Sequence, residues 1–392
     1  MQDRRSSSST FEHLRSTASD WATNVPEPSR NLWRRKGMGA RGERRFNIGS
    51  SILIGLMAVG WGWSIANARD EVAPGVPTTA GILSRALTDP HAPSVAYLTD
   101  AALILVTPLR GESGKLRANL QSPGETLPAD SLPSGAVATF SSPAAGVRPE
   151  STAVLATPRR TGIWSLAIAI GEAVRPIADF SVITLKPASA EQAGRIGLYY
   201  IGNWPSARKT AKAIYTPPAG FIEVTQQQEN TFLSEHFRLR DFFPHDQANV
   251  WPKYIVVNMK IVDKIELVLI DLEKHGIPSR GVRVLSGFRT PQYNRAGGDP
   301  TGRASLSRHM YGDAADIFID NDGNGSMDDL NHDGRVNIDD ARVILAAVNR
   351  VEAAHPSLIG GCGVYSGTSA HGPFTHIDTR GYPARWIGTG DN

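Results

Sequence analysis

The sequence predicts an α+β C-terminal domain, preceded by a small all-β, sandwich-like domain and by an N-terminal transmembrane or signal helix. Three observations predict this: an uncharged stretch near the N-terminus, a series of short apolar runs separated by turn residues, and a final region that mixes one helical pattern with separate strand-like runs. A chain of 392 residues is long enough for two folded domains and additional segments.

Charge is unevenly distributed, although the formal net charge is only +3. Basic residues are concentrated in the first 45 positions and acidic residues in 313–340. Because no stretch combines basic and aromatic residues as nucleic-acid readers do, we expect no nucleic-acid partner. The single cysteine, Cys362, excludes an internal disulfide and a cysteine-rich zinc finger, and its place between glycines predicts a small residue in a tight turn.

The N-terminal region reads as a basic tail followed by a membrane-directed helix. Residues 1–45 are rich in Ser and Arg and are predicted to form a disordered cytoplasmic tail. Residues 46–68 carry no charge and are long enough to cross a bilayer. Basic residues come before this stretch and Asp70 and Glu71 follow it, so the bulk of the chain is expected on the periplasmic side.

The same region leaves two alternatives open. The helix is either retained, giving a single-pass inner-membrane protein with the membrane as a partner, or removed by cleavage near Ala68, giving an exported protein. Translation starts at either Met1 or Met38, and a start at Met38 gives a signal peptide of ordinary length.

The middle of the chain shows strand patterns without a cluster of titratable residues. Residues 69–93 have a linker composition, and 94–190 alternate short apolar runs with turns such as "RGESGK" and "LPSG", as expected of a β-sandwich. Residues 191–230 are a connector punctuated by Gly and Pro.

The C-terminal domain is expected to span 231–392. A short helix is predicted at "LSEHFRLRDFF", with Ser234 as its N-cap or as a turn residue before it. A core helix is predicted from the apolar spacing between Met259 and Leu272, ending at Gly276. Strands are predicted at 283–290, 314–319 and 372–379. Strands and helices without strict alternation indicate the α+β class.

Three residues in this domain form a candidate zinc site: His309, Asp316 and His376. Zinc prefers imidazole nitrogen and carboxylate oxygen, and a catalytic site uses three protein ligands. Asp316 begins an apolar strand, where an ionised carboxylate is costly unless a cation or hydrogen bonds compensate. His376 shares a strand face with Phe374 and Asp378.

The motifs around these residues resemble a known family. "SRHMYGDAAD" matches the pattern S-x-H-x-x-G-x-A-x-D, "FTHIDT" matches the later segment with the third ligand, and "SGFRTPQYN" matches an S-G-[FY]-R-[TS] loop. This is similar to the D-alanyl-D-alanine carboxypeptidase-like zinc metallopeptidases, which share a fold with the Hedgehog signalling domain. The resemblance covers roughly 233–386. Its last part is Arg385-Trp386, where the similar proteins have R-x-x-W or R-H-W.

The resemblance implies roles for the site residues. His309, Asp316 and His376 would hold zinc, Arg289 would grip a carboxylate or peptide oxygen of the substrate, and Ser307 would orient the substrate or His309. Better-known members place Asp or Glu three residues before the last His, where this chain has Pro373. His371 and Asp378 are the two substitutes for the general base; His371 is the slightly preferred one, and Asp378 is the candidate for orienting a ligand.

An acidic insertion at 320–341 has the spacing of calcium loops, as in a dockerin or EF-hand repeat. One loop starts at Asp329, with Gly334 at the sharp turn, and a weaker one starts at Asp320, with Gly325 at the turn; they share Asn331. The expected calcium ligands are Asp320, Asp322, Asn324, Asp328, Asp329, Asn331, Asp333, Arg335 through its backbone carbonyl, Asn337 and Asp340. Two separate full repeats are missing, so we expect no protein partner at this insertion.

The sequence therefore predicts a zinc-dependent peptidase that hydrolyses peptidoglycan peptides at D-amino-acid bonds through a metal-activated water. Whether it acts as a carboxypeptidase or an endopeptidase is open. The alternatives are a non-catalytic cell-wall-binding module or a calcium-dependent assembly module on the same fold. Zn²⁺ and Ca²⁺ are the expected cofactors, and no nucleophile elbow, P-loop or dinucleotide fingerprint is present.

Overall fold

The computed structural model describes residues 102, 105–128, 136–142, 148–152, 155–171, 173–205, 213–296, 303–368 and 371–388. Contacts divide the chain into Met1–Ala80 and Gly81–Asn392. The first unit lies outside the described residues, and so do the predicted tail, the membrane helix and the whole of the predicted linker. No helix within the described ranges is both long enough and apolar enough to cross a bilayer.

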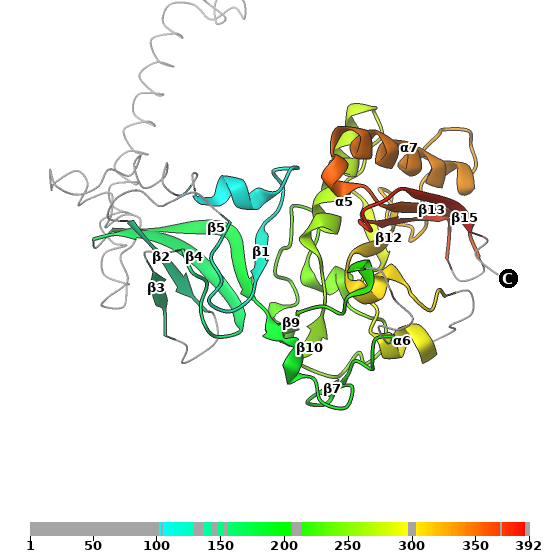
Figure 1. The fold of residues 1–392 in the computed structure, drawn as a ribbon. Helices are drawn as coiled ribbons and strands as arrows, with labels where there is room; N and C mark the ends of the chain where they lie inside the picture. The colour runs from blue at the N-terminus through cyan, green and yellow to red at the C-terminus, as the bar shows by residue number, and fades with distance from the viewer. Residues whose placement is uncertain are drawn as a thin grey trace, which may run out of the picture. The chain divides into compact units, whose positions relative to one another are not determined.

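The first folded part is one five-stranded sheet with the order β1-β5-β4-β2-β3 (Figure 1). Its pairs are antiparallel, except that β1 and β5 run parallel. A 3₁₀ turn, η2, precedes it. The bounds are η2 Thr107–Arg110, β1 Ala118–Gln121, β2 Ala136–Ser141, β3 Glu150–Thr152, β4 Gly162–Ile170 and β5 Ala173–Thr184. Across its described residues this part has one sheet and not the two facing sheets expected of a sandwich.

Alternation along β4 and β5 gives this sheet two buried faces. Trp164 and Val182 lie in a small core with Phe140, whereas their neighbours Ile163 and Ile183 belong to the larger core of the C-terminal part. Successive side chains of a strand point to opposite faces, which explains how adjacent residues join different cores. The sheet therefore does not need a second sheet to cover its other face.

Short elements connect this sheet to the C-terminal part. They include a three-stranded sheet, β10-β9-β6, and the hairpin β7-β8. The bounds are β6 Lys186–Pro187, η3 Ala188–Ala190, β7 Arg195–Ile196, β8 Tyr199–Tyr200, η5 Ala213–Tyr215, β9 Gly220–Val224, η6 Gln226–Gln228, η7 Leu239–Phe242 and β10 Lys253–Ile255.

The short helix predicted from Leu233 is wrong, because only the 3₁₀ turn η7 forms there. Of the two roles expected of Ser234, the structure shows the turn: its hydroxyl accepts a hydrogen bond from the Phe237 amide, and the Leu233 amide donates to the Phe237 carbonyl. The side chains of Leu233, Phe237 and Leu239 all reach the main core from this irregular segment. The apolar residues of this segment are therefore buried from a turn and not from one face of a helix, as their spacing suggested.

The C-terminal part contains a five-stranded sheet with the order β11-β12-β14-β13-β15. All its pairs are antiparallel except β13 with β15. The bounds are α5 Met259–Lys274, β11 Val282–Ser286, α6 Pro291–Ala296, η8 Arg308–Tyr311, β12 Ala314–Ile319, α7 Ile338–Ala354, η9 Pro356–Leu358, β13 Gly361–Tyr365, β14 Phe374–Asp378 and β15 Ala384–Gly388. This mixture of strands and few helices is the expected α+β class.

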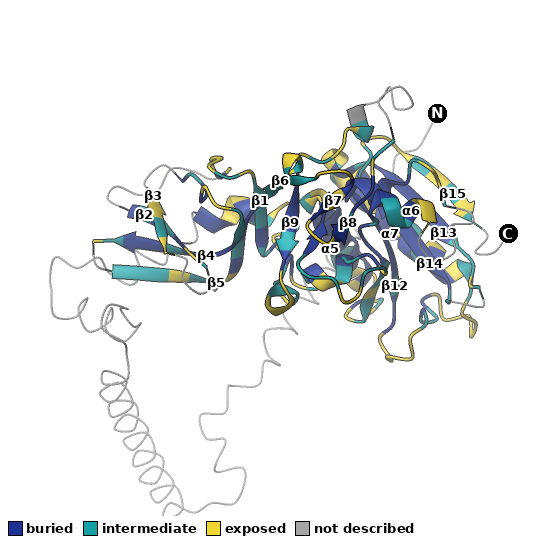
Figure 2. Ribbon diagram, turned by 90° about the horizontal axis from the view of Figure 1, so that it is seen from below, coloured by how far each residue is buried: buried dark blue, intermediate teal, exposed yellow. Residues whose placement is uncertain are grey.

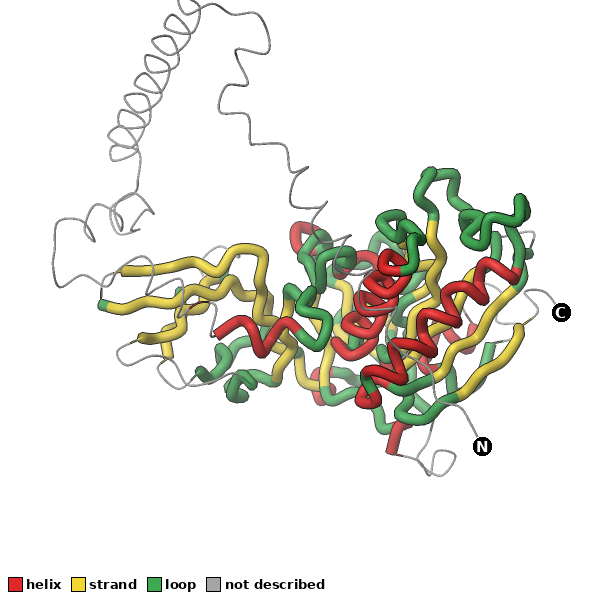
Figure 3. Tube along the Cα trace, turned by 90° about the horizontal axis from the view of Figure 1, so that it is seen from above, coloured by secondary structure: helices red, strands yellow, loops and turns green. Residues whose placement is uncertain are grey.

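The two long helices lie alongside this sheet, as Figure 3 shows. Helix α5 packs against α7, and α7 packs against β13 and β14. Helix α5 begins at the Asn258 cap and ends before Gly276, whose φ of +78° is the left-handed conformation that ends many helices. In this part, burial is concentrated in α5 and in the three central strands β12, β14 and β13 (Figure 2).

Strands β13 and β15 are two strands of this sheet that the sequence did not predict. The "GGCGVY" segment was expected to form a turn, but Cys362 lies in β13, opposite Ile377 of β14, and is fully buried. Burial raises the pKa of the Cys362 thiol to about 12. A thiol with so high a pKa carries almost no thiolate at neutral pH, which excludes it as a nucleophile.

Candidate metal centre

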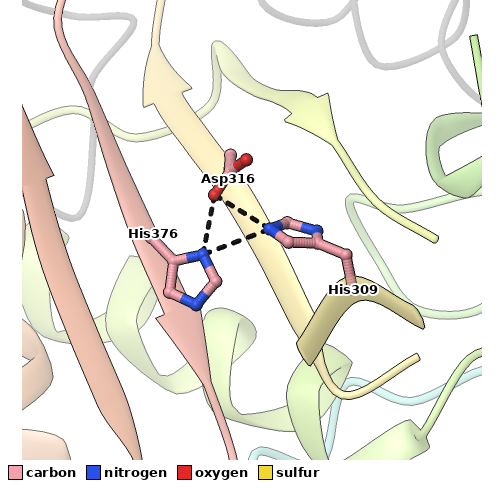
Figure 4. A group of neighbouring side chains, drawn as sticks. All are labelled: His309, Asp316 and His376. Atoms are coloured by element: carbon pink, nitrogen blue, oxygen red, sulfur yellow. Dashed lines mark hydrogen bonds and ion pairs between the residues drawn. The ribbon is translucent and has the colours of Figure 1, made fainter. Parts of the chain in front are cut away.

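Two neighbouring strands and one turn bring His309, Asp316 and His376 together (Figure 4). Asp316 on β12 and His376 on β14 are direct cross-strand partners, and His309 comes from the turn η8 immediately before β12. Directly opposed residues of an antiparallel pair have side chains on the same face of the sheet. The strand register therefore places two of the three side chains together, and the turn adds the third.

The three donor atoms form a triangle of the size that zinc requires. His309 Nε2 lies 3.2 Å from Asp316 Oδ1 and 3.2 Å from His376 Nδ1, and His376 Nδ1 lies 2.8 Å from Asp316 Oδ1. Zinc bonds of about 2.0–2.2 Å in tetrahedral geometry place ligand atoms about 3.3 Å apart. All three residues are buried. The donor set and its spacing thus fit a zinc ion.

The turn that carries His309 is fixed by its neighbours in sequence. Gly312 has a φ of +70°, and a Cβ there would lie 2.5 Å from the Val256 carbonyl oxygen, so only glycine fits. Arg308 pairs with Asp313 across the turn, and its guanidinium also contacts the Tyr311 ring. The turn is consequently rigid on both sides of the ligand.

Hydrogen bonds behind the imidazoles set which nitrogen faces the metal. The Nδ1 of His309 lies 2.7 Å from the Gly287 carbonyl oxygen. Because a carbonyl oxygen can only accept a hydrogen bond, Nδ1 carries the proton, and the lone pair on Nε2 is left to bind a metal. The Nε2 of His376 lies 3.1 Å from Asp378 Oδ2. Carboxylates and carbonyls in this position orient metal-binding histidines.

The ionisation of His309 and Asp316 suits a cation. Burial and the nearby Arg289 charge lower the pKa of His309 to about 4, so His309 is neutral at pH 7 and can bind a metal. Burial opposes ionisation of Asp316, but His309, His376 and Arg289 outweigh it and hold the pKa of Asp316 well below its usual range. Burial lowers the pKa of His376, but its hydrogen bonds to Asp316 and Asp378 reverse the effect and raise it.

Asp378 is placed behind His376 and not beside the three donor atoms. Its Oδ1 accepts from the Gly361 amide at 2.7 Å, and both of its oxygens accept from Arg380 Nε at 2.9 Å. It is fully buried, and burial opposes its ionisation, but the hydrogen bonds and charges of His376 and Arg380 outweigh burial and hold the pKa of Asp378 below its usual range. All of these partners favour the carboxylate that orients His376.

Arg289 contacts a metal ligand directly. Its Nη2 donates to Asp316 Oδ2 at 2.7 Å, and its Nε donates to Ser286 Oγ at 2.8 Å. Nη1 makes no hydrogen bond to any residue that the structure describes. Ser307 precedes the turn, but its hydroxyl forms no hydrogen bond with His309 or with another described residue, so the structure does not show the orienting contact expected of it.

His371 lies in the segment just before β14. Its ring packs edge-on against Phe374 at 5.0 Å between centroids, and its Nδ1 lies 2.9 Å from the Gly372 carbonyl oxygen. Because that oxygen accepts only, the proton of the neutral ring lies on Nδ1 and the lone pair on Nε2. No hydrogen bond joins His371 to the three donor residues.

Aromatic residues beside the triad were not identified from the sequence as site residues. The Trp386 ring lies 5.2 Å from the His376 ring, its Nε1 donates to the Tyr365 hydroxyl at 2.8 Å, and Tyr365 stacks on Phe374. Gly363 makes room for the indole, because a Cβ there would lie 2.3 Å from it. In the sequence, only the Arg385-Trp386 pair indicated that an aromatic residue belongs to this site.

A second group of acidic residues lies in the insertion between β12 and α7. Asp320, Asp322 and Asp328 each bring one carboxylate oxygen within 4.8 Å of the others. Backbone amides donate to carboxylates in this loop and in the overlapping one: Asp322 accepts from Asn324, Asp329 accepts from Gly334, and Asp333 accepts from Arg335. Asn337 caps α7 by accepting from the Asp339 amide.

The fold brings together a His₂Asp donor set that could hold a metal ion, and zinc is bound by donors of these types. Residues 249–333 match the family model described as Peptidase M15, a zinc D-Ala-D-Ala carboxypeptidase-like family, which confirms the resemblance over these residues. The match covers less than half of the chain and includes His309 and Asp316 but not His376. Searches of curated proteins and of solved structures found no match.

The first prediction concerns the three donor residues. The full chain should bind one zinc ion, and His309→Ala or His376→Ala should weaken binding by more than about 100-fold, beyond what loss of a group behind the ligands costs. Competition with a chelator, followed by metal analysis, measures this. His245→Ala, at an exposed site, is the control and should bind as the wild type does. Unchanged zinc affinity in both ligand variants would refute the site.

The second prediction concerns Asp378. Asp378→Asn keeps the side-chain shape but removes the charge behind His376, so zinc affinity should fall about 10–100-fold while the stoichiometry at saturating zinc stays at one. The same chelator competition measures both quantities. A variant that binds zinc as tightly as the wild type would show that Asp378 does not support His376.

Proposed function

We propose that this protein is a zinc-dependent peptidase that hydrolyses peptidoglycan peptides at bonds involving D-amino acids. The observation that carries the proposal is the buried triangle of His309 Nε2, Asp316 Oδ1 and His376 Nδ1, whose edges of 2.8–3.2 Å match a tetrahedral zinc site. The Peptidase M15 match supports a metallopeptidase, and the motifs shared with D-Ala-D-Ala carboxypeptidase-like enzymes support the substrate class and the Hedgehog-like fold.

The three donor residues would hold the ion, which supplies a water of lowered pKa and polarises the scissile carbonyl. The protein's own contribution is to hold the donors in place: Gly287 orients His309, Asp378 orients His376, and Arg289 keeps Asp316 ionised. Because Arg289 already donates to Asp316, its position is fixed before substrate binds. Its remaining nitrogen, Nη1, is the group we assign to a carboxylate or carbonyl oxygen of the substrate.

His371 is the residue that we assign as general base. Asp378 is the other candidate, but its oxygens already accept from His376, Arg380 and the Gly361 amide. The Nε2 of His371 carries the lone pair of the neutral ring, since Nδ1 donates to the Gly372 carbonyl. A neutral imidazole with an accessible lone pair is the usual form of a general base near pH 7.

The peptidoglycan substrate also requires that the protein leave the cytoplasm. The uncharged stretch at 46–68, with basic residues before it, supports export with either retention in the inner membrane or cleavage near Ala68. Both outcomes place the metal centre on the same side of the membrane as the cell wall.

The third prediction tests the activity itself. The zinc-loaded full chain should cleave a muropeptide substrate, either a stem pentapeptide ending in D-Ala-D-Ala or a peptide-cross-linked dimer, as followed by mass spectrometry of the products. A chelator should abolish cleavage and added zinc should restore it. His309→Ala should be inactive at every substrate concentration. Binding of both muropeptides without cleavage would instead support the non-catalytic wall-binding alternative.

The fourth prediction tests the base. His371→Ala should lower kcat by about 10²–10⁴-fold, the usual contribution of a positioned base, with zinc stoichiometry unchanged. His245→Ala should leave the rate as it is in the wild type. A His371→Ala protein that retains wild-type kcat would remove His371 from the mechanism.

A further inference from the structure

The insertion between β12 and α7 contains a cation-binding arrangement that the peptidase proposal does not use. Asp320, Asp322 and Asp328 direct carboxylate oxygens to within 4.8 Å of one another. Asp320 is 4% exposed, so part of this negative charge is buried. Three carboxylates this close repel one another unless a cation lies between them.

One oxygen in this group is buried and has no hydrogen-bond partner. Asp320 Oδ2 accepts from the Gly325 amide at 3.2 Å and lies 3.5 Å from Arg283 Nε, but Oδ1 is buried with no donor in reach. A buried carboxylate oxygen left without a partner costs free energy that nearby groups must offset. A cation among the three carboxylates supplies the missing interaction.

The donor chemistry and the spacing select calcium. Asp320, Asp322, Asn324 and Asp328 stand at positions 1, 3, 5 and 9 of a twelve-residue calcium loop, and position 7, Ser326, contributes a backbone carbonyl. Gly325 has a φ of +87° at the sharp turn of position 6. All these donor atoms are oxygens, and a site made only of oxygens suits calcium better than zinc. A hollow of about 470 Å³ beside the loop, lined partly by Asp322, Asn324 and Asp328, leaves room for coordinating water.

We propose that the loop from Asp320 to Asn331 binds one calcium ion. The sequence favours the overlapping loop from Asp329, because its twelfth position is the carboxylate Asp340. The twelfth position of the first loop is Asn331, which is a poorer ligand. In the structure, however, Asp340 accepts backbone hydrogen bonds from Leu330 and Asn337, which close the turn and cap α7. The close carboxylate group and the unpartnered oxygen both belong to the first loop.

The same loop supports the segment that carries His371. A Cβ on Gly372 would lie 2.4 Å from Ser326 Oγ, so Gly372 is in tight contact with position 7 of the calcium loop. Met327 and Leu330, on either side of Asp328, are buried in the main core. Calcium bound at Asp320, Asp322 and Asp328 therefore stiffens the support behind residues 371–373 as well as the loop.

The fifth prediction is a calcium titration by calorimetry of the full chain after zinc loading. The wild type should bind calcium, and Asp322→Asn and Asp328→Asn should each weaken this site at least tenfold, because each removes a charged donor. Asp339→Asn, an exposed carboxylate outside the proposed ligands, is the matched control and should change the affinity less than twofold. Asp333→Asn, which weakens only the second loop, should still bind one calcium ion.

Failure of the proposal has a clear form. It is overturned if the wild type takes up no calcium at millimolar concentration, or if Asp322→Asn and Asp328→Asn bind as the wild type does while Asp333→Asn binds none. Zinc content and circular dichroism confirm that each variant is folded. Hydrogen exchange of residues 371–376 should slow on calcium addition in the wild type only; unchanged exchange there would refute the support of the His371 segment. None of these measurements depends on peptidase activity.

Discussion

The pairing of β12 with β14 is the constraint on which the metal centre depends. This register sets Asp316 opposite His376 in the interior of the sheet, where an ionised carboxylate and two imidazoles have no water to solvate them. A slip of one residue would turn one of these side chains to the other face of the sheet and separate the two. The rest of the domain acts to keep this register and to balance the charge that it buries.

That balance is achieved by a layer of charged groups around the donors. Arg289 compensates Asp316, and Arg380 compensates Asp378. Lys264, fully buried on α5, donates to the Asp378 carbonyl at 2.8 Å and to Glu352 of α7 at 2.6 Å, and burial lowers its pKa. Removing one member of such a pair leaves an unpaired buried charge, which is far more costly than losing a surface ion pair. The two helices thus fix the end of β14 electrostatically as well as by packing.

The two proposed ions have different physical tasks. The zinc donors are two nitrogens and one oxygen, buried and close to a tetrahedral arrangement, as expected of an ion that activates water. The calcium donors are all oxygen, on a loop whose carboxylates are partly exposed, as expected of an ion that stiffens a segment. Contact between Ser326 and Gly372 connects the second site to the start of β14, so the proposed calcium ion would stiffen the chain next to the strand that carries His376.

The sequence by itself determined the local elements and the identity of the donors. Helix α5 followed from its apolar spacing and from Gly276, and the bounds of β12 followed from an apolar run. The three candidate metal donors followed from short, contiguous motifs. Only the tertiary structure decided how these pieces pair. Strand β13 was not predicted because the glycines around Cys362 are typical of a turn. In the structure these glycines leave space for Trp386 and for the backbone of the neighbouring strand. A second sheet was expected in the first folded part, but its described residues form one sheet, and the second face of that sheet packs against the core of the C-terminal part. The contact of Arg289 with Asp316 likewise depends on residues that meet only when β11 and β12 pair.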